Sequence, residues 1–315
     1  MRPFISILIP AYQAQNTIRR CLNSVLNQTI DDFEVILIND GSKDETLSIC
    51  HEFSAFECLK VISQDNVGIA ATRNKLLEYA TGEYIQFVDA DDWIENDTVE
   101  RLKACINTRK YDMIISDFIA EYVNSSKYIL QQPSGVDCAS LVKDISSSRM
   151  LGALWNKLIK RELLNDIVVP DLRYCEDWVV SVHLFEKVKS VLYLNDAFYH
   201  YDNSFIGNSL TRNISKDTFN SRIEYIEHLK SLNFNDRYPI EFASQVSSIA
   251  YTAVIHEIYT KKDFNQMFGE VSFIKNYISS YKKLILMISR IFSIPFASFI
   301  DGIVRKMLKK GIMYK

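Results

Sequence analysis

The sequence lacks the signatures of several common protein classes. Its six cysteines lie far apart, with no Cys-x-x-Cys pair and no histidine spacing typical of zinc sites. We therefore expect reduced thiols and a cytosolic compartment, because disulfides persist mainly in oxidising environments. Neither a Gly-x-Gly-x-x-Gly fingerprint nor a Gly-Lys-Ser/Thr phosphate loop occurs, which argues against dinucleotide cofactors and ATP hydrolysis.

Long hydrophobic runs are also missing. Met1-Arg2-Pro3 leads directly into the strand-like segment Phe4 to Ile9, with no basic leader, apolar core and small-residue cleavage site, so we expect no export. Near the C-terminal end, the apolar stretches Leu284 to Ser289 and Ile291 to Ile300 are each shorter than the ~20 residues that span a bilayer. The sequence therefore predicts no transmembrane helix.

Charge is spread unevenly along a chain that is otherwise typical of globular proteins. The 315 residues are 48% apolar and 24% charged, with a net charge of -3, which suits a large buried core. The segment 281–315 holds eight Lys or Arg residues and one acid, Asp301, so it carries +7 and leaves -10 for the remainder. Such a basic, apolar tail is typical of a segment that lies on an anionic membrane. A terminal helix packed on the domain with a solvated basic face fits the same pattern. Nucleic acid is not an expected partner, because no reader motif is present.

The first part of the chain alternates between apolar runs and helical patterns. Ser42 and Glu45 have the spacing of a capping box at the start of one helix. The alternation predicts an α/β architecture, a mostly parallel sheet with helices on both faces, in which ligands gather at the carboxyl ends of the strands. The expected strands cover residues 4–9, 33–38, 59–62 and 84–88, and the expected helices cover residues 18–26, 42–53 and 70–79.

Polar clusters follow three of these strands. They are Pro10-Ala11-Tyr12, Asn39-Asp40-Gly41-Ser42 and Asp89 to Asp92. Each alone is typical of a turn. In a parallel sheet, however, they meet at one edge together with the loop Asn66-Val67-Gly68 and the pair Arg73-Asn74, which predicts a polar pocket.

The third cluster places Asp89, Asp91 and Asp92 at a strand end with no cation beside them. Ionised carboxylates this close repel one another, so either a proton is retained or a hard divalent cation lies between them and the phosphates of a ligand. The second case predicts a nucleotide-using enzyme, whereas a solvated acidic turn is the simpler alternative.

Taken in order, these motifs resemble the inverting glycosyltransferases of family 2, which have the A-type nucleotide-diphospho-sugar-binding fold. The resemblance covers about residues 1–212 and departs at Asn39, where the family often has Asp. The motifs that carry it are Ile-Pro-Ala-Tyr (9–12), Asn-Asp-Gly-Ser (39–42), Asn-x-Gly-x-x-x-x-Arg-Asn (66–74), Gly-Glu-Tyr (82–84), Asp-Ala-Asp-Asp (89–92), Trp-Asn-Lys-Leu (155–158) and Glu-Asp (176–177).

The resemblance implies a nucleotide site in which Asp40 accepts a hydrogen bond from the base. Asp89 would reach the ribose or a metal-bound water, and Asp91 would coordinate Mn2+ or Mg2+, which bridges the phosphates. Asp92 would instead cap the next turn. The other residues that it places around the nucleotide are Pro10, Ala11, Tyr12, Asn66, Gly68, Arg73 and Ala90.

Two further positions have weaker assignments. His200 lies in a family region that approaches the metal or the diphosphate, although a lone histidine on a strand is more often packed or hydrogen-bonded. Arg212 is a similar candidate for the diphosphate.

An inverting transfer needs a base to take the proton of the acceptor hydroxyl. The resemblance assigns this role to Asp177, with Glu176 positioning the acceptor; the exchanged roles remain open. Two carboxylates at a helix start would also favour the helix dipole without any catalytic role. Trp155, Asn156 and Lys157 would shape the donor and acceptor pocket, although a tryptophan is as often a core residue.

These expectations divide the chain into a catalytic domain (1–213), a helical appendage (214–280) and a basic, amphipathic, membrane-associating tail (281–315). The expected function is metal-dependent transfer from a UDP-sugar to a growing capsule, O-antigen or similar surface glycan. The expected acceptor is linked to a polyprenyl diphosphate, at the inner face of the cell membrane. A nucleotidyltransferase should carry a basic Gly-rich loop, which Pro10 to Gln15 lacks. A non-catalytic nucleotide-binding scaffold should have lost its acidic ligands or its base, yet all are present.

Overall fold

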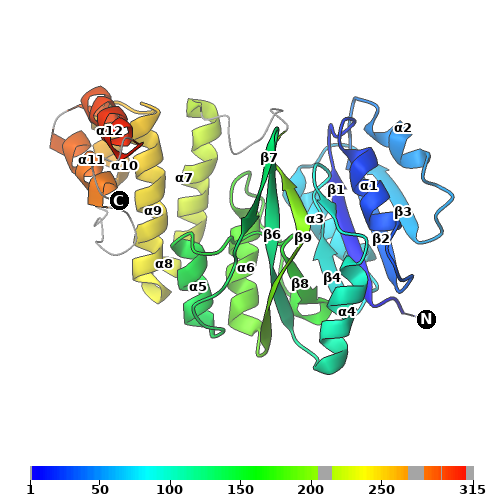
Figure 1. Ribbon diagram of the computed structural model, residues 1–315. Helices are drawn as coiled ribbons and strands as arrows, with labels where there is room; N and C mark the ends of the chain where they lie inside the picture. The colour runs from blue at the N-terminus through cyan, green and yellow to red at the C-terminus, as the bar shows by residue number, and fades with distance from the viewer. Residues whose placement is uncertain (1, 205–214, 269–279, 292, 310–315) are drawn as a thin grey trace. The chain divides into compact units, whose positions relative to one another are not determined.

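The structure, a computed structural model, describes residues 2–204, 215–268, 280–291 and 293–309 (Figure 1). The chain forms two compact units. The first comprises residues 1–145 and 149–207, and the second comprises residues 146–148 and 208–315.

The first unit is built on a nine-stranded sheet with the order β3-β2-β1-β4-β8-β6-β9-β5, to which β7 is added beside β6. Its strands are β1 (Ile5–Ala11), β2 (Phe33–Asp40), β3 (Leu59–Gln64), β4 (Tyr84–Phe87), β5 (Trp93–Ile94), β6 (Met113–Tyr122), β7 (Ser125–Ile129), β8 (Lys157–Lys160) and β9 (Val191–Asp202). Its helices are α1 (Ile18–Leu26), α2 (Thr46–His51), α3 (Ile69–Tyr79), α4 (Thr98–Thr108), α5 (Cys138–Ser146), a 3-10 turn at Arg161–Leu164, and α6 (Glu176–Lys187).

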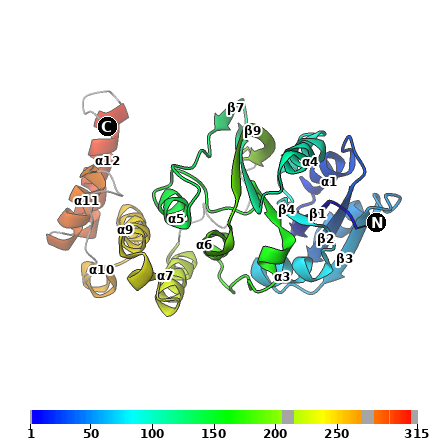
Figure 2. The same ribbon diagram turned by 90° about the horizontal axis from the view of Figure 1, so that it is seen from below.

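The first four strands in space, β3, β2, β1 and β4, run parallel, as the sequence predicts. All seven residues of β1 are buried, which is typical of a strand covered by helices on both faces. Figure 2 shows α1 and α4 on one side of these strands and α3 on the other. The carboxyl ends of β1, β2 and β4 therefore meet at one edge, where Ala11 pairs with Asn39 and the strand partner of Phe87 is Leu8.

The remainder of the sheet is mixed. β8 runs antiparallel between β4 and β6, while β9 lies parallel to β6 and antiparallel to β5. The A-type fold and its flanking helices are as expected. However, the alternation of strand and helix patterns in the first half of the sequence indicates only the parallel part of the sheet. β8 and β9 join strands far away along the chain, so no local pattern shows their direction.

An aromatic stack supports the sheet below its functional edge. The Trp155 ring stacks on Tyr199 and Tyr201, with centroids 4.5 and 5.4 Å away, and meets Phe118 edge-on at 4.9 Å. Trp155 and Tyr199 are buried. Because large buried rings contribute much of the apolar contact area, this stack fixes β9 against the rest of the sheet.

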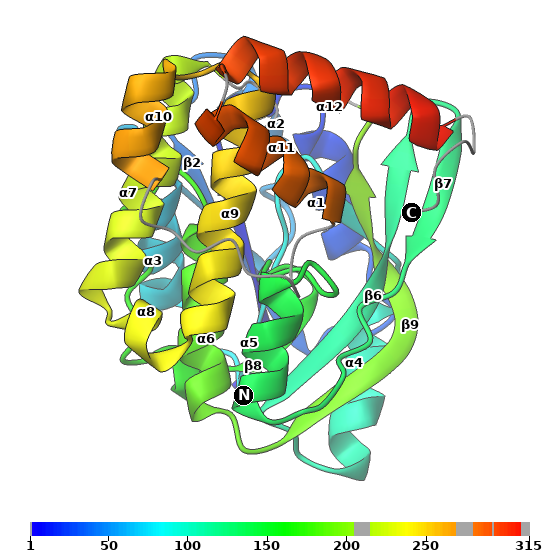
Figure 3. The same cartoon turned by 90° about the vertical axis from the view of Figure 1, so that its left-hand side faces the viewer.

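The second unit is helical in its described part. α9 packs with α11 and α12, and Figure 3 shows these two helices beside it. Among the described residues, none of the helices combines the length and the apolar content that crossing a bilayer requires. Its helices are α7 (Lys216–Ser231), α8 (Phe234–Arg237), α9 (Pro239–Ile255), α10 (Lys261–Phe268), α11 (Ser280–Ile291) and α12 (Ile294–Lys309).

Gly82 provides a test of the close approach between β1 and the start of β4. A Cβ at this position would lie 2.5 Å from the Ser6 backbone nitrogen, so the backbone itself would have to shift. We expect Gly82→Ala to lower the free energy of unfolding by about 2–3 kcal/mol, because overpacking costs are of that order. Gly302→Ala, where nothing lies within 4 Å, should be neutral or stabilising in denaturant titrations. A neutral Gly82→Ala would contradict the packing described.

Candidate active site

Asp40, at the end of β2, organises the loop that follows β3. Its carboxylate accepts hydrogen bonds from the backbone N–H groups of Val67 and Gly68, both at 2.9 Å, and from Gln64. The Asn66 side chain donates to the Asp40 carbonyl. The two loops predicted to converge therefore do so, and Asp40 holds them. A contact between Asp40 and a base would be added to these bonds and stays a prediction.

The residues beside this loop that the resemblance places around the nucleotide differ in exposure. Tyr12 follows β1 and is 54% exposed, Asn66 is exposed and Gly68 is half-buried, whereas Pro10 and Ala11 are buried backbone supports. Gly68 has φ +88°, a conformation that L side chains rarely adopt, and it begins α3.

The acidic cluster after β4 has three different environments. Asp89 is half-buried, Asp91 is exposed and Asp92 is fully buried, with the buried Ala90 between the first two. The Asp92 carboxylate accepts hydrogen bonds from the Tyr199 hydroxyl at 2.6 Å and from the Asp202 backbone N–H at 2.8 Å. Asp92 thus anchors β9 beneath the site.

Arg73 joins the end of β4 to the start of α6. Its guanidinium is buried and bonds to Glu176, while its second terminal nitrogen lies 3.4 Å from Asp89. Its Nε atom is buried without a hydrogen-bond partner. Arg73 was predicted to line the base and ribose, which stays a prediction. The structure shows that it brings the two acidic motifs of the sequence into one site.

Glu176 and Asp177 form the first turn of α6, as predicted, directly after Cys175, whose φ of +60° is left-handed. One Asp177 oxygen accepts the Trp178 backbone N–H at 2.8 Å, and no hydrogen bond from the described residues reaches the other. Burial, followed by the charge of Glu176, raises the pKa of Asp177 to about 7. A carboxyl group with this pKa exchanges a proton readily near neutral pH.

Asp91 is suited to a hard cation. Although the residue is exposed, the surrounding protein removes part of the water around its carboxyl group, and this effect, followed by repulsion from Asp89, raises the pKa of Asp91 to about 6. A divalent cation would relieve both effects, and Mg2+-type ions use one or two carboxylates plus phosphate oxygens. Within the described part of the chain, no three His, Cys, Asp or Glu side chains form a complete metal site. The residues therefore fit a cation whose other ligands come from a bound diphosphate.

The His200 ring contacts two carboxylates and one aromatic ring. Its Nδ1 lies 2.8 Å from Glu121, its Nε2 lies 2.9 Å from Glu95, and its ring stacks on Trp93. A metal contact would have to replace one carboxylate partner, so that role stays a prediction. Arg212 lies outside the described residues.

Trp155, Asn156 and Lys157 are all buried. The Lys157 ammonium donates to the carbonyls of Leu151 and Ala153 and to the Asn156 side chain, and burial lowers its pKa to about 7. These residues support the site from within the sheet. A direct contact with sugar or acceptor stays a prediction.

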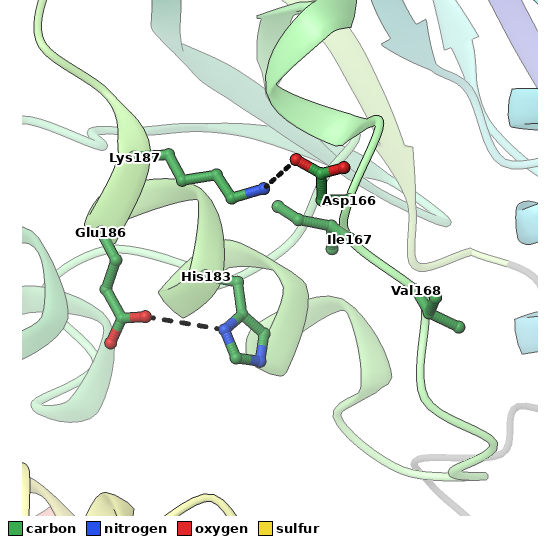
Figure 4. Close-up of a pocket in the computed structure, with 6 residues that line it drawn as sticks. All are labelled: Asp166, Ile167, Val168, His183, Glu186 and Lys187. Atoms are coloured by element: carbon green, nitrogen blue, oxygen red, sulfur yellow. Dashed lines mark ion pairs between the residues drawn. The ribbon is translucent and has the colours of Figure 1, made fainter.

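A separate shallow pocket lies farther along α6 (Figure 4). His183 and Glu186 are 3.6 Å apart and Lys187 lies 3.9 Å from Asp166, so its ion pairs are loose. At 1.5 Å of rise per residue, His183 lies roughly 9 Å along the helix from Asp177. This pocket is therefore distinct from the acidic site.

Two residues that support the acidic cluster after β4 are not predicted by the sequence. Arg20 donates to the Asp91 carbonyl at 2.7 Å, pairs with Asp202 and covers the Trp93 ring at 3.8 Å. Tyr199 bonds to Asp92 and accepts the Asp89 backbone N–H at 3.2 Å. The only sequence signal for Tyr199 is its inward place in a strand, and nothing in the sequence marks Arg20.

Comparisons with known proteins identify the family of the chain. The family model described as "Glycosyl transferase family 2" matches residues 6–168, more than half of the chain, so the chain belongs to this family. A putative glycosyltransferase of Bacillus subtilis, EpsH, is 34% identical over 209 residues, which are 63% of this chain and 60% of that protein. Glycosyltransferase GlyA of Streptococcus pneumoniae is 28% identical over 75% of this chain and 36% of its own length. The chain thus spans only part of these relatives.

The fold is shared with solved structures. Residues 1–349 of Staphylococcus aureus TarS superpose with a TM-score of 0.65 and 22% identity, covering 99% of this chain and 93% of that one. The same protein was also solved with UDP-GlcNAc.

Arg73→Gln tests the bridge between the two acidic motifs. Removing one partner of a buried charge network leaves Asp89 and Glu176 uncompensated, so we expect a loss of about 3 kcal/mol in the free energy of unfolding. The Arg73 charge also lowers the pKa of Asp177, so the variant should titrate Asp177 above its present value. Chemical denaturation and carboxyl NMR measure the two effects.

The matched control is Arg101→Gln, because Arg101 is a partly exposed arginine that also pairs with two acids, Asp97 and Asp196. It should cost less than about 1 kcal/mol. Equal losses in the two variants would show that the Arg73 bridge is no more than a surface ion pair.

Proposed function

We propose that this protein is a metal-dependent inverting glycosyltransferase that moves a sugar from a UDP-sugar to a hydroxyl group of a growing surface glycan. One observation carries the proposal. Arg73 joins Asp89, beside the expected phosphate site, to Glu176, which adjoins a carboxyl group of neutral pKa. The proposed donor site and the proposed base would thus lie in one unit.

The donor half would use the edge formed by β1, β2 and β4. Tyr12 and the Asp40-held loop would enclose the uracil and ribose, and Asp89 would bond to the ribose or to a metal-bound water. The UDP-GlcNAc complex of TarS supports a uridine nucleotide, since that protein shares the fold.

Asp91, with Asp89, would hold Mn2+ or Mg2+. When bound, such a cation stabilises the negative charge that develops on the departing diphosphate. A mannosyltransferase of Pyrobaculum calidifontis that shares the fold, with a TM-score of 0.51 and 14% identity, was solved with GDP-Man and Mn2+.

The acceptor half would use the start of α6. Asp177 would take the proton of the acceptor hydroxyl as that oxygen attacks the anomeric carbon and the bond to the diphosphate breaks. Glu176 is already engaged by Arg73, whereas one Asp177 oxygen accepts no protein hydrogen bond from the described residues. This difference favours Asp177 as the base and Glu176 as the positioning residue.

The acceptor is proposed to be a glycan linked to a polyprenyl diphosphate, at the inner face of the cell membrane. The chondroitin synthase of Pasteurella multocida, 43% identical over 99 residues that are 31% of this chain and 10% of that protein, supports a glycan product in general. The basic charge of residues 281–315 supports an anionic membrane as the place of action.

Asp91→Ala tests the donor site by calorimetry with UDP. We expect wild-type binding to require Mn2+ or Mg2+, and the variant to lose at least about tenfold in affinity, because a hard cation then lacks its carboxylate. Asp166→Ala is the matched control, since Asp166 is exposed in the Figure 4 pocket. Metal-independent UDP binding of equal strength in all three proteins would refute the assignment.

Asp177→Asn tests the base. With the donor sugar bound, we expect kcat to fall about 10²–10⁴-fold, the usual contribution of a general base. Wild-type kcat/KM should rise with pH and level off above about 7, because Asp177 must lose its proton to act. Glu186→Gln, on the same helix, should keep wild-type rates. A pH profile unchanged in Asp177→Asn would assign the base elsewhere.

A further inference from the structure

The last two helices of the second unit, α11 and α12, pack on α9. Their buried side chains, among those described, lie on one side of each helix. On α11 the inward residues are Ile285, Leu286 and Ser289, each fully buried, and on α12 Ile294 and Ala297 are buried. Both helices contact α9 and each other (Figure 3). Within the described residues, the two helices of the basic tail are therefore packed on α9 through their buried side chains.

The other side of these helices carries large apolar side chains. On α12, Phe296, Phe299 and Ile303 are 45%, 64% and 40% exposed, and their spacing places them on one helix face. We call these three residues the α12 apolar row. On α11, Leu284 and Met287 are 49% and 55% exposed. Single exposed apolar residues are ordinary, but a continuous row on a helix is typical of an interaction surface.

The charge composition of the segment 281–315 favours an anionic partner. Asp301, its single acid, is buried and accepts hydrogen bonds from the Tyr251 hydroxyl at 2.5 Å and from Arg305 at 2.6 Å. Its negative charge is therefore neutralised inside the unit. Arg305 is one of the eight Lys or Arg residues in the segment 281–315, so the other seven, with no other acid in the segment, give it a net charge of +7.

We propose that the α12 apolar row, with Leu284 and Met287, docks on the surface of an anionic lipid bilayer. The row would enter the headgroup region, and the net positive charge of the segment 281–315 would attract the anionic headgroups, as in other interfacial helices. At 1.5 Å per residue α12 is only about 24 Å long, which suits a helix that lies along the surface. This inference rests on the proposed function, which gives the enzyme a reason to act at a membrane. The residues that carry it, on α11 and α12, do not belong to the candidate active site.

The test is co-sedimentation of the full chain with vesicles of phosphatidylglycerol and phosphatidylcholine in equal parts, and with phosphatidylcholine alone. We expect binding to the mixed vesicles only, weakened by salt. Phe296→Ser with Phe299→Ser should lower the partition coefficient by about tenfold or more, because apolar burial supplies much of interfacial binding. The matched control is Ile240→Ser with Met267→Ser, which alters two exposed apolar residues elsewhere in the same unit.

Each outcome decides the proposal. Equal loss in the control pair, no loss in the α12 pair, or equal binding to both vesicle types overturns it. If the α12 pair fails to fold, a Phe299→Trp variant replaces it, and its fluorescence should be quenched by brominated anionic lipids. UDP binding by the same preparations, measured without vesicles, separates the two proposals. Intact UDP binding without membrane binding overturns only this inference. Membrane binding without UDP binding overturns the proposed function.

Discussion

The Arg73 bridge is the interaction on which the candidate site depends. Asp89, Asp91, Glu176 and Asp177 come from two distant parts of the chain, and Arg73 is the cation that contacts two of them. Without it, burial and mutual repulsion would force these groups apart or into their neutral forms. One arginine does not neutralise four acids, and a nucleotide diphosphate would add further negative charge. In the proposed chemistry, a divalent cation at Asp91 would offset part of this excess of negative charge.

Rigid supports surround this charged centre. Asp92 bonds to Tyr199 and to the backbone of Asp202, while Arg20 pairs with Asp202 and with the carbonyl of Asp91. The contacts of Asp91 and Asp92 join the turn after β4 to α1 and to β9, and the pair of Arg20 with Asp202 joins α1 to β9. Strand β9 and Arg20 of α1 thus hold the turn Asp89 to Asp92 in place. The backbone of Asp91 is fixed by these contacts while its side chain stays exposed.

The sequence predicts the first half of the fold because local periodicity shows strands and helices that alternate. It also predicts that Asp40, Asp89 and Glu176 belong to functional motifs, and the structure brings these together. It does not predict the antiparallel β8, the buried cage around Lys157 or the Arg20 contacts, because these depend on pairings between distant residues. Even local capping differs: Asp44, not Ser42, accepts the Thr46 N–H at the start of α2, while Ser42 accepts the N–H of Gln13.

The distribution of charge along the chain differs between the segment proposed to bind a membrane and the remainder, which holds the proposed active site. Residues 281–315 carry +7 and the remainder carries -10, so the protein as a whole should be repelled weakly by an anionic membrane. At physiological ionic strength, however, charges act over a Debye length of about 8 Å, so only the nearest groups count. A segment with a net charge of +7 that lies at the membrane is then attracted regardless of the net charge of the chain. Asp301 is buried and pairs with Arg305 within the unit, so the one acid of the segment offsets one cation and the other seven set the attraction to anionic headgroups.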